Sequence, residues 1–288
     1  MKGVMGAYLR LKVISRAMLI KRLLVTIVLL PIGLAVIALG GVAYSGLITL
    51  IMALAAWEYI QLFRAGGLQP AGILVVAGAA LLVIGRAWNG FESANWLISL
   101  LILASVTYHL GSYERGRNPS GTDFGVTLAG ILYIGWLGAY LVSLRNLPDG
   151  EWWVLLALPS VWMTDTGAFV IGSTLGRHQL NRRLSPKKTW EGYIGGVFCG
   201  TLAGALLALA IQSGAGPIPA ITPLNGAILG FVIGVTTLLG DLGESMIKRQ
   251  VGAKDSGKML PGHGGIFDRI DSWLWAGVIS YYIIYWFF

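Results

Sequence analysis

The sequence predicts an all-α membrane protein, a polytopic bundle of about nine transmembrane helices. Of its 288 residues, 56% are hydrophobic and only 12% are charged, whereas roughly 25% are charged in an ordinary soluble domain. Apolar runs recur along the whole chain, and many approach the ~20 residues that a helix needs to cross the hydrocarbon core. The 41 glycines are scattered through these runs without a fixed period, as is typical of closely packed membrane helices.

The expected spans follow one another with short connections, and the third is short and rich in glycine. They cover approximately Leu23–Leu39, Tyr44–Phe63, Pro70–Gly85, Ala94–Leu110, Phe124–Leu144, Trp152–Ile171, Gly192–Ile211, Thr222–Gly240 and Ser272–Phe288. Basic residues precede the first apolar run, as in a signal peptide, but no small-residue cleavage pattern clearly follows it. We therefore expect the first helix to be retained.

The basic residues predict the orientation of the bundle, because Lys and Arg are retained on the cytoplasmic side of a membrane. With the N-terminus in the cytoplasm, every Lys and Arg except Arg86 and Arg145 falls in a cytoplasmic segment. Such loops lie near anionic lipid headgroups and account for the net charge of +8. We therefore expect a cytoplasmic N-terminus and no nucleic-acid partner.

Two carboxylates lie inside predicted spans, where an ionisable group is costly and usually pairs, binds an ion or lines a cavity. Asp165 belongs to the run WMTDTGAFVIG, whose threonines and glycine fit a cavity that opens to the cytoplasm. Glu58 follows Trp57 in the second span and has no partner that the sequence can assign. A structural hydrogen bond explains Glu58 at least as well as catalysis does, so we leave it outside the site.

The loop after the sixth span contains SPKKTWEG, which predicts the start of a helix. Ser185 would cap this helix and Pro186 would be its first residue. Lys187 and Lys188 would then lie in the first turn, where cations oppose the helix dipole unless an anion is close. A bound phosphate would supply that anion, but the two lysines could equally hold the loop at the lipid surface.

The segment after the eighth span, GDLGESMIKRQVGAKDSGKMLPGHGGIFDRIDS, holds a dense set of charged residues and glycines. If the eighth helix continues past the membrane surface, one of its faces carries Asp241, Glu244, Ser245 and Lys248. A solvated helix face would explain these charges as well. The glycines around His263 leave the backbone free to approach a ligand, and such loops can present N–H groups to phosphate.

Asp268 and Asp271 lie three residues apart at the start of the last span, hence on one helical face. Capping of the helix dipole would explain either one alone. Mg²⁺ is usually held by one or two carboxylates together with substrate phosphates and water, and Asp241, Asp268 and Asp271 could supply such a centre. His263 has no second histidine at ligand spacing, which argues against zinc. It could bind phosphate, transfer a proton or stabilise the turn.

The stretch SMIKRQVGAKDSGKMLPGHGGIFDRID, from Ser245 to Asp271, resembles the signature of the phosphatidate cytidylyltransferases, also called CDP-diacylglycerol synthases. The motifs GDLGE, SPKKTWEG and WMTDTGAFVIG resemble family motifs too, so the likeness covers most of the C-terminal half. The first 150 residues resemble the family only in being hydrophobic spans. Phe169 stands where the family often has tyrosine, which leaves that hydroxyl without a role here.

This resemblance implies that CTP and phosphatidic acid react to give CDP-diacylglycerol and pyrophosphate. It also implies Mg²⁺, often with a monovalent cation such as K⁺, and a homodimer in the inner cell membrane with its active site facing the cytoplasm. We expect residues 1–150 to form a scaffold and dimer contact, and residues 151–288 to form the catalytic region. A phosphatidate oxygen would attack the α-phosphorus of CTP.

The resemblance and the residue types together give the expected site. Metal ligands would be Asp241, Asp268 and Asp271, and the other catalytic residues would be Lys248 and His263. Substrate-binding residues would be Asp165, Lys187, Lys188, Glu191, Glu244, Ser245, Arg249, Lys254, Asp255, Gly264, Gly265 and Arg269.

Two other classes of membrane protein compete with this interpretation. A CDP-alcohol phosphotransferase also holds aspartates and Mg²⁺ at a membrane surface, but its characteristic Asp-Gly, Ala-Arg, Gly, Asp, Asp series is absent from the sequence. A transporter would place carboxylates in glycine-rich spans and would be built from two related halves with discontinuous helices. The sequence instead concentrates its charge in the second half and has no visible internal repeat.

Overall fold

The computed structural model of the protein describes residues 27, 29–257, 259 and 264–288. Most of them are helical, which confirms the all-α prediction apart from one small hairpin. The labelled elements are α2 (Gly41–Ala65), α3 (Gly72–Asn89), α4 (Glu92–Glu114), α5 (Ser120–Gly130), the π-helical segment η1 (Ile131–Trp136), α6 (Leu137–Arg145), α7 (Gly150–Leu175), β1 (Gln179–Asn181), β2 (Ser185–Thr189), α8 (Trp190–Ala215), α9 (Pro223–Gln250) and α10 (Phe267–Phe287).

Seven helical runs in the described part of the chain are long and apolar enough to cross a membrane. They are α2, α3, α4, the continuous run α5–η1–α6, α7, α8 and α9. Each overlaps one of the predicted spans two to eight, so the protein is a multi-pass membrane protein. The helix Leu29–Leu39 is shorter, and the start of the first predicted span lies outside the described residues. Nine spans and a cytoplasmic N-terminus stay predictions.

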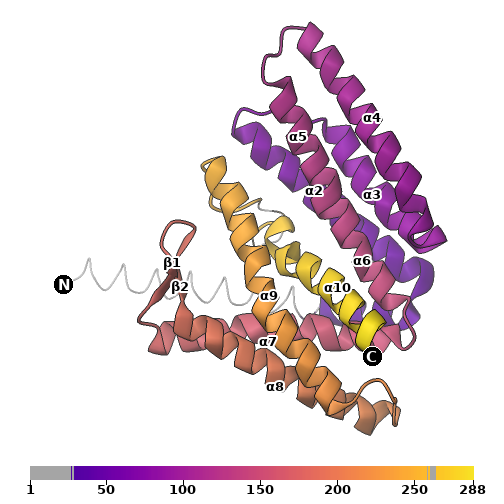
Figure 1. The fold of residues 1–288 in the computed structure, drawn as a ribbon, viewed down its shortest axis with the longest axis vertical. Coiled ribbons are helices and arrows are strands. Elements are labelled where there is room, and N and C mark those ends of the chain that lie inside the picture. Colours follow the sequence, from indigo (N-terminus) through magenta and orange to yellow (C-terminus); the bar gives the residue numbers. More distant parts are fainter. Residues whose placement is uncertain (1–26, 28, 258, 260–263) are drawn as a thin grey trace, which may run out of the picture.

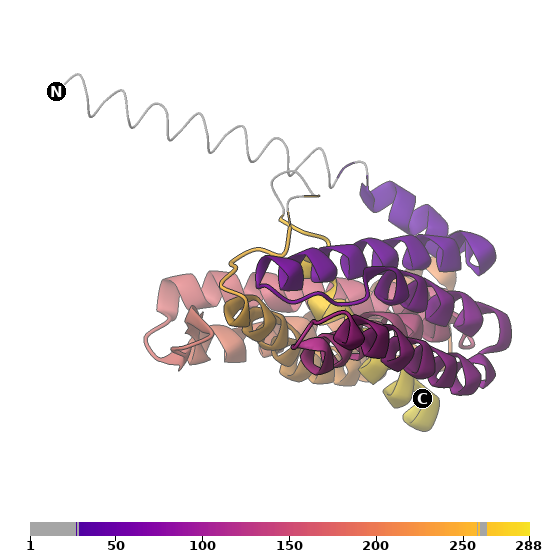
Figure 2. The same cartoon turned by 90° about the horizontal axis from the view of Figure 1, so that it is seen from above.

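The helices form two groups that α10 joins (Figure 1). Helices α2 to α6 pack on one another in the first group, and α7, α8 and α9 form the second. Helix α10 packs against α9 on one side and against α6 on the other. Figure 2, turned by 90°, shows the β1–β2 hairpin at the end of the α7–α9 group away from α4. Residues from both groups can therefore meet near the start of α10.

Helix α8 packs against its two neighbours through glycines, so that backbones touch without intervening side chains. Gly204 and Gly226 face each other across α8 and α9, and a Cβ on either would clash with the carbonyl oxygen of the other. Against α7, a Cβ on Gly196 would lie 2.8 Å from the carbonyl oxygen of Thr164. Small residues at such crossings let membrane helices approach closely, so α7, α8 and α9 form a tightly packed unit.

Two buried charged residues of the first helix group, Arg86 and Asp123, have partners within that group. Arg86 is 2% exposed and donates to Ser143 Oγ at 2.8 Å. Its guanidinium also lies over the ring of Phe91, 3.6 Å from the centroid. Asp123 is fully buried and accepts from Arg117 Nε at 2.5 Å. These charges are explained by the packing of the α2–α6 group itself.

Gly204→Val is expected to lower the thermal unfolding temperature of the detergent-solubilised protein, because the added side chain would force α8 and α9 apart. Overpacking of this kind costs on the order of 3 kcal/mol. Gly214→Val is the control, since nothing lies within 4 Å of a Cβ built there on the same helix. Equal unfolding temperatures for the two variants, measured by circular dichroism, would contradict the close crossing.

Candidate active site

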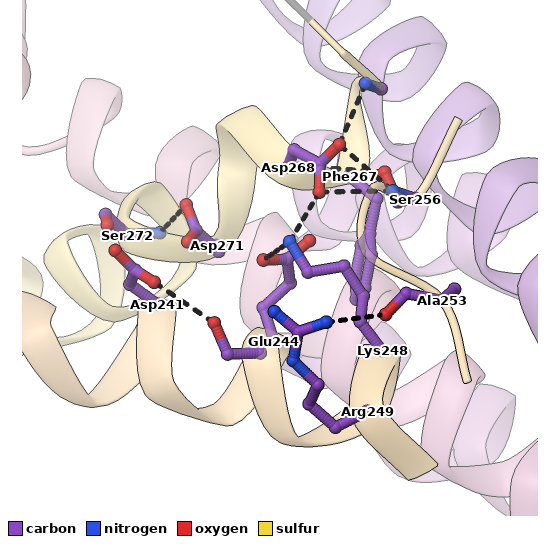
Figure 3. A network of polar contacts seen from close by, with 12 residues as sticks. Asp241, Glu244, Lys248, Arg249, Ala253, Ser256, Phe267, Asp268, Asp271 and Ser272 are labelled. Atoms are coloured by element: carbon purple, nitrogen blue, oxygen red, sulfur yellow. Dashed lines mark hydrogen bonds and ion pairs between the residues drawn. The ribbon is translucent and has the colours of Figure 1, made fainter. Parts of the chain in front are cut away.

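The C-terminal extension of α9 carries the polar face that its sequence predicts. Helix α9 continues well past Gly240, the predicted end of the eighth span. This confirms the expected helical extension. Ser245 Oγ donates to Asp241 Oδ1 at 3.4 Å, and Lys248 Nζ donates to Glu244 Oε2 at 2.6 Å. All four side chains therefore lie along one side of α9, beside the first turns of α10 (Figure 3).

A first cluster of charges, here called the lysine cluster, consists of Glu244, Lys248 and Asp268. Lys248 Nζ lies 2.6 Å from Glu244 and 2.8 Å from Asp268, and the two carboxylate side chains are only 3% and 11% exposed. Asp268 also accepts the backbone N–H groups of Ser256, at 3.1 Å, and Gly265, at 2.9 Å. The lysine cluster therefore fastens the segment that leads into α10 onto α9.

A second group, here called the carboxylate cluster, consists of Asp165, Asp241 and Asp271 together with Lys188. These residues come from α7, α9, α10 and β2, and each pair of the three carboxylates interacts electrostatically. Lys188 forms an ion pair with Asp241 and attracts the other two. Figure 3 shows Asp241 and Asp271 on the side away from Lys248. The three acidic groups outnumber the Lys188 ammonium and the guanidinium of Arg269, which also attracts Asp165, so the cluster favours a further cation.

The prediction that Ser185 begins a helix is wrong, because SPKKT forms strand β2 of an antiparallel hairpin with β1. Helix α8 is capped four residues later by Thr189, whose hydroxyl accepts from Gly192 N at 3.2 Å. This arrangement keeps both lysines out of the first turn, where they would oppose the helix dipole. Successive strand residues point to opposite sides: Lys187 is exposed, and Lys188 reaches Asp241.

Two other predicted substrate-binding residues have local partners in this structure. Glu191 accepts the backbone N–H groups of Arg177, at 3.1 Å, and His178, at 3.2 Å, and it pairs with the His178 ring at 2.5 Å. Glu191 thus holds the chain between α7 and β1. Arg249 is exposed, and its Nη1 donates to the carbonyl oxygen of Ala253 at 3.3 Å.

The remaining predicted site residues lie around the start of α10. Lys254, Asp255 and Arg269 are exposed. Arg269 attracts Asp165 electrostatically, so it belongs beside the carboxylate cluster. Gly264 has φ +83°, a conformation that favours glycine, and the N–H of Gly265 is directed at Asp268. His263 lies outside the described residues.

Glu58 contacts the segment before α10, although sequence reasoning left it outside the site. It is 3% exposed and accepts the backbone N–H of Phe267 at 2.9 Å and the Ser256 hydroxyl at 3.3 Å. The sequence shows only that a carboxylate lies in an apolar span. Its partners are about two hundred positions away in the chain, and no local pattern connects them.

The donor chemistry of the carboxylate cluster fits a hard cation such as Mg²⁺. Within residues 29–257 and 264–288, no three His, Cys, Asp or Glu side chains are gathered so that they alone could hold a metal ion. Mg²⁺ requires fewer, because one or two carboxylates suffice when substrate phosphates and water complete its octahedron. Asp241 and Asp271 offer such a pair with Asp165 close by, whereas Asp268 binds Lys248 and two backbone N–H groups.

An apolar cavity of about 920 Å³ lies between the α5–η1 run and α9. None of the residues that line it is charged. On α9 its lining includes Gly243, Met246 and Gln250, which lie on the side of the helix opposite Asp241 at the helical period. This cavity is therefore distinct from both charged clusters.

The fold and these clusters define a multi-pass helical membrane protein with an acidic, lysine-bearing centre at one end of the bundle. The chain belongs to the Cytidylyltransferase family, whose model matches residues 20–287. It is 32% identical to a phosphatidate cytidylyltransferase of Synechocystis sp. over 92% of this chain and 96% of that protein. It is 33% identical to the Brucella suis enzyme of the same name over 90% and 91% of the two chains. A Mycobacterium tuberculosis enzyme of that name is 39% identical over 51% of this chain and 42% of its own.

Lys248→Met is expected to destabilise the protein, because it leaves two nearly buried carboxylates in the lysine cluster without a counter-charge. Breaking such a pair costs about 3 kcal/mol, or on the order of 5 °C in the unfolding temperature. Arg249→Met, on the next and exposed residue, should change the temperature little. The double variant Lys248→Met with Glu244→Gln should recover part of the loss. An unchanged unfolding temperature in Lys248→Met would rule out this role.

Proposed function

We propose that this chain is a phosphatidate cytidylyltransferase, which converts CTP and phosphatidic acid to CDP-diacylglycerol and pyrophosphate. The observation that carries the proposal is the carboxylate cluster of Asp165, Asp241, Asp271 and Lys188, which α7, α9, α10 and β2 bring together. The relatives that bear this name align with about nine tenths of the chain, and the matching family model spans residues 20–287, which include the whole cluster. The same alignment supports a single activity for the whole chain.

In the proposed reaction, an oxygen of the lipid phosphate attacks the α-phosphorus of CTP. The new P–O bond joins the two phosphates, the bond to the β-phosphate breaks, and pyrophosphate leaves. The attacking oxygen is already anionic at neutral pH, so no strong base is required. The main tasks of the protein are then to align two polyanions and to neutralise their charge. Lys188 and Arg269 lie where they can do so beside the carboxylate cluster.

The proposed site needs added positive charge, because both substrates are anionic and the carboxylate cluster is acidic. Mg²⁺ bound by Asp241 and Asp271, with Asp165 beside them, would neutralise phosphate oxygens during the transfer. A monovalent cation such as K⁺ remains part of the proposal. Asp268 and Glu244 fix the ammonium group of Lys248 in the lysine cluster. From there Lys248 would bind phosphate groups of the substrates.

The transporter alternative has less support from the fold. It predicts discontinuous helices in two related halves. Each of the seven membrane-crossing runs in the described residues is continuous, and the two helix groups differ in the number of their helices. No observation on this chain favours the transporter over the transferase.

Purified protein in detergent is expected to release pyrophosphate only when CTP, phosphatidic acid and Mg²⁺ are all present. Asp241→Asn, Asp268→Asn and Asp271→Asn should each lower the rate by roughly 100-fold or more, because each removes a charge on which the alignment of the phosphates depends. Glu92→Gln, an exposed change in the first turn of α4, should retain the wild-type rate. Turnover of dATP or of a soluble alcohol in place of these substrates would refute the proposal.

We also propose that the enzyme is a homodimer in the cell membrane and that its active site faces the cytoplasm. Residues 177–188 and 248–269, which cover the hairpin region and the α9–α10 junction, carry ten of the fifteen basic residues that follow residue 22. Arg86 and Arg145 end α3 and α6, which run toward the opposite side. This asymmetry is the one expected for cytoplasmic loops.

Thiol labelling in intact cells tests the orientation. In a Cys199→Ala background, Glu92→Cys should react with a membrane-impermeant maleimide in intact spheroplasts, because the start of α4 would face outward. Arg182→Cys, on the hairpin, should react only after the membrane is permeabilised. The reverse pattern would show that the carboxylate cluster faces the other side.

A further inference from the structure

Glu58 of α2 is bonded to the segment that leads into α10. Its side chain is 3% exposed, and its Oε2 accepts both the Phe267 N–H at 2.9 Å and the Ser256 hydroxyl at 3.3 Å. A carboxylate is costly to bury unless hydrogen bonds compensate it. A buried carboxylate of the first helix group therefore contacts the segment that leads into α10.

Two glycines of the stretch from Ser245 to Asp271 pack directly against the Glu58 carboxylate. A Cβ on Gly257 would clash with Glu58 Oε1, and a Cβ on Gly265 would clash with Glu58 Oε2 and with Ser256 Oγ. Sequence reasoning assigned Gly265 to substrate binding. That assignment stays a prediction, and in the structure the lack of a side chain at Gly265 makes room for Glu58.

The bonds continue from Glu58 into the lysine cluster. The Ser256 hydroxyl donates to Glu58 and accepts from the Asp268 N–H at 3.3 Å. The Ser256 N–H in turn donates to the Asp268 carboxylate at 3.1 Å, and that carboxylate binds Lys248 at 2.8 Å. Figure 3 shows Ser256, Phe267, Asp268 and Lys248 gathered in this arrangement. An unbroken path of hydrogen bonds thus runs from α2 to the Lys248 ammonium.

We infer that Glu58 is a positioning residue for nucleotidyl transfer. Its carboxylate fixes the segment around Ser256 and Phe267, so that Asp268 holds Lys248 in place for the phosphates of CTP. This inference rests on the proposed function. It also gives the N-terminal half a direct part in building the site, beyond the scaffold and dimer contact that the sequence predicts for residues 1–150.

Asp123 provides a matched comparison within the same helix group. It is also a fully buried carboxylate, and it binds Arg117 at 2.5 Å and the Gln69 N–H at 2.8 Å. Both of these partners belong to the α2–α6 group or its connections. A general loss of packing in this group should therefore affect Asp123 and Glu58 variants alike, whereas a positioning role should separate them.

The experiment compares Glu58→Leu, Glu58→Gln and Asp123→Leu with the wild-type enzyme. Glu58→Leu removes the acceptor at similar size and should raise KM for CTP about 10-fold or more, the equivalent of one lost buried hydrogen bond. KM for phosphatidic acid should stay within about 2-fold. Glu58→Gln keeps an oxygen that both donors can reach, so it should restore KM for CTP to within about 3-fold of wild type. Asp123→Leu should lower the unfolding temperature and leave KM for CTP unchanged.

Hydrogen–deuterium exchange gives a readout that does not depend on activity. Peptides containing the amides of Ser256, Gly265 and Phe267 should exchange faster in Glu58→Leu than in wild type, Glu58→Gln or Asp123→Leu. If Glu58→Leu does not fold, Ser256→Ala removes the same link from the other side and should raise KM for CTP about 5-fold by the same reasoning.

Several outcomes would overturn the inference. One is faster exchange in Glu58→Leu with KM for CTP unchanged. Another is an equal effect of Glu58→Leu and Asp123→Leu on both KM values, which would leave Glu58 a purely structural role. A wild-type protein without CTP-dependent pyrophosphate release would refute the proposed function itself. Exchange in Glu58→Leu would then still show whether this carboxylate holds the segment.

Discussion

Lys248 lies between two nearly buried carboxylates, Glu244 on its own helix and Asp268 on α10. A charge can be buried in a helix bundle only where an opposite charge and hydrogen bonds compensate it. This requirement determines how the end of α9, the segment after it and the start of α10 are placed. Through Asp268 and Ser256 it also reaches Glu58. The arrangement of the whole charged centre depends on this compensation.

The two charged clusters differ in how well they are compensated. In the lysine cluster, the ammonium and the backbone N–H groups satisfy Asp268, and among the described residues only Glu244 Oε1 of this cluster lacks a hydrogen-bond partner. In the carboxylate cluster, Lys188 is shared among three acidic groups that repel one another. A centre with uncompensated negative charge is suited to a cation and phosphates, whereas a compensated one is suited to holding other groups still. The carboxylate cluster would bind the reacting groups, and the lysine cluster would hold the surrounding residues in place.

The sequence predicted what local patterns determine. Hydropathy located the seven long membrane-crossing runs, and the helical period placed Glu244 and Lys248 on one face. Prediction from the sequence failed at the start of α8, where two local signals competed. Ser185 looked like the helix cap, but Thr189 is the actual cap. The sequence could not assign Glu58, because that contact depends on how distant helices pack.

The glycine contacts of α8 have a mechanical consequence. Helices α7 and α9 are both packed backbone to backbone against α8. Asp165 on α7 and Asp241 on α9 therefore belong to one tightly packed unit. Asp271 lies on α10, which packs between that unit and α6. At Asp271 itself α10 approaches α9 in the same way, because a Cβ on Gly240 would lie 2.6 Å from the carbonyl oxygen of Asp271. Close contacts at glycines therefore set the spacing of all three aspartates of the carboxylate cluster.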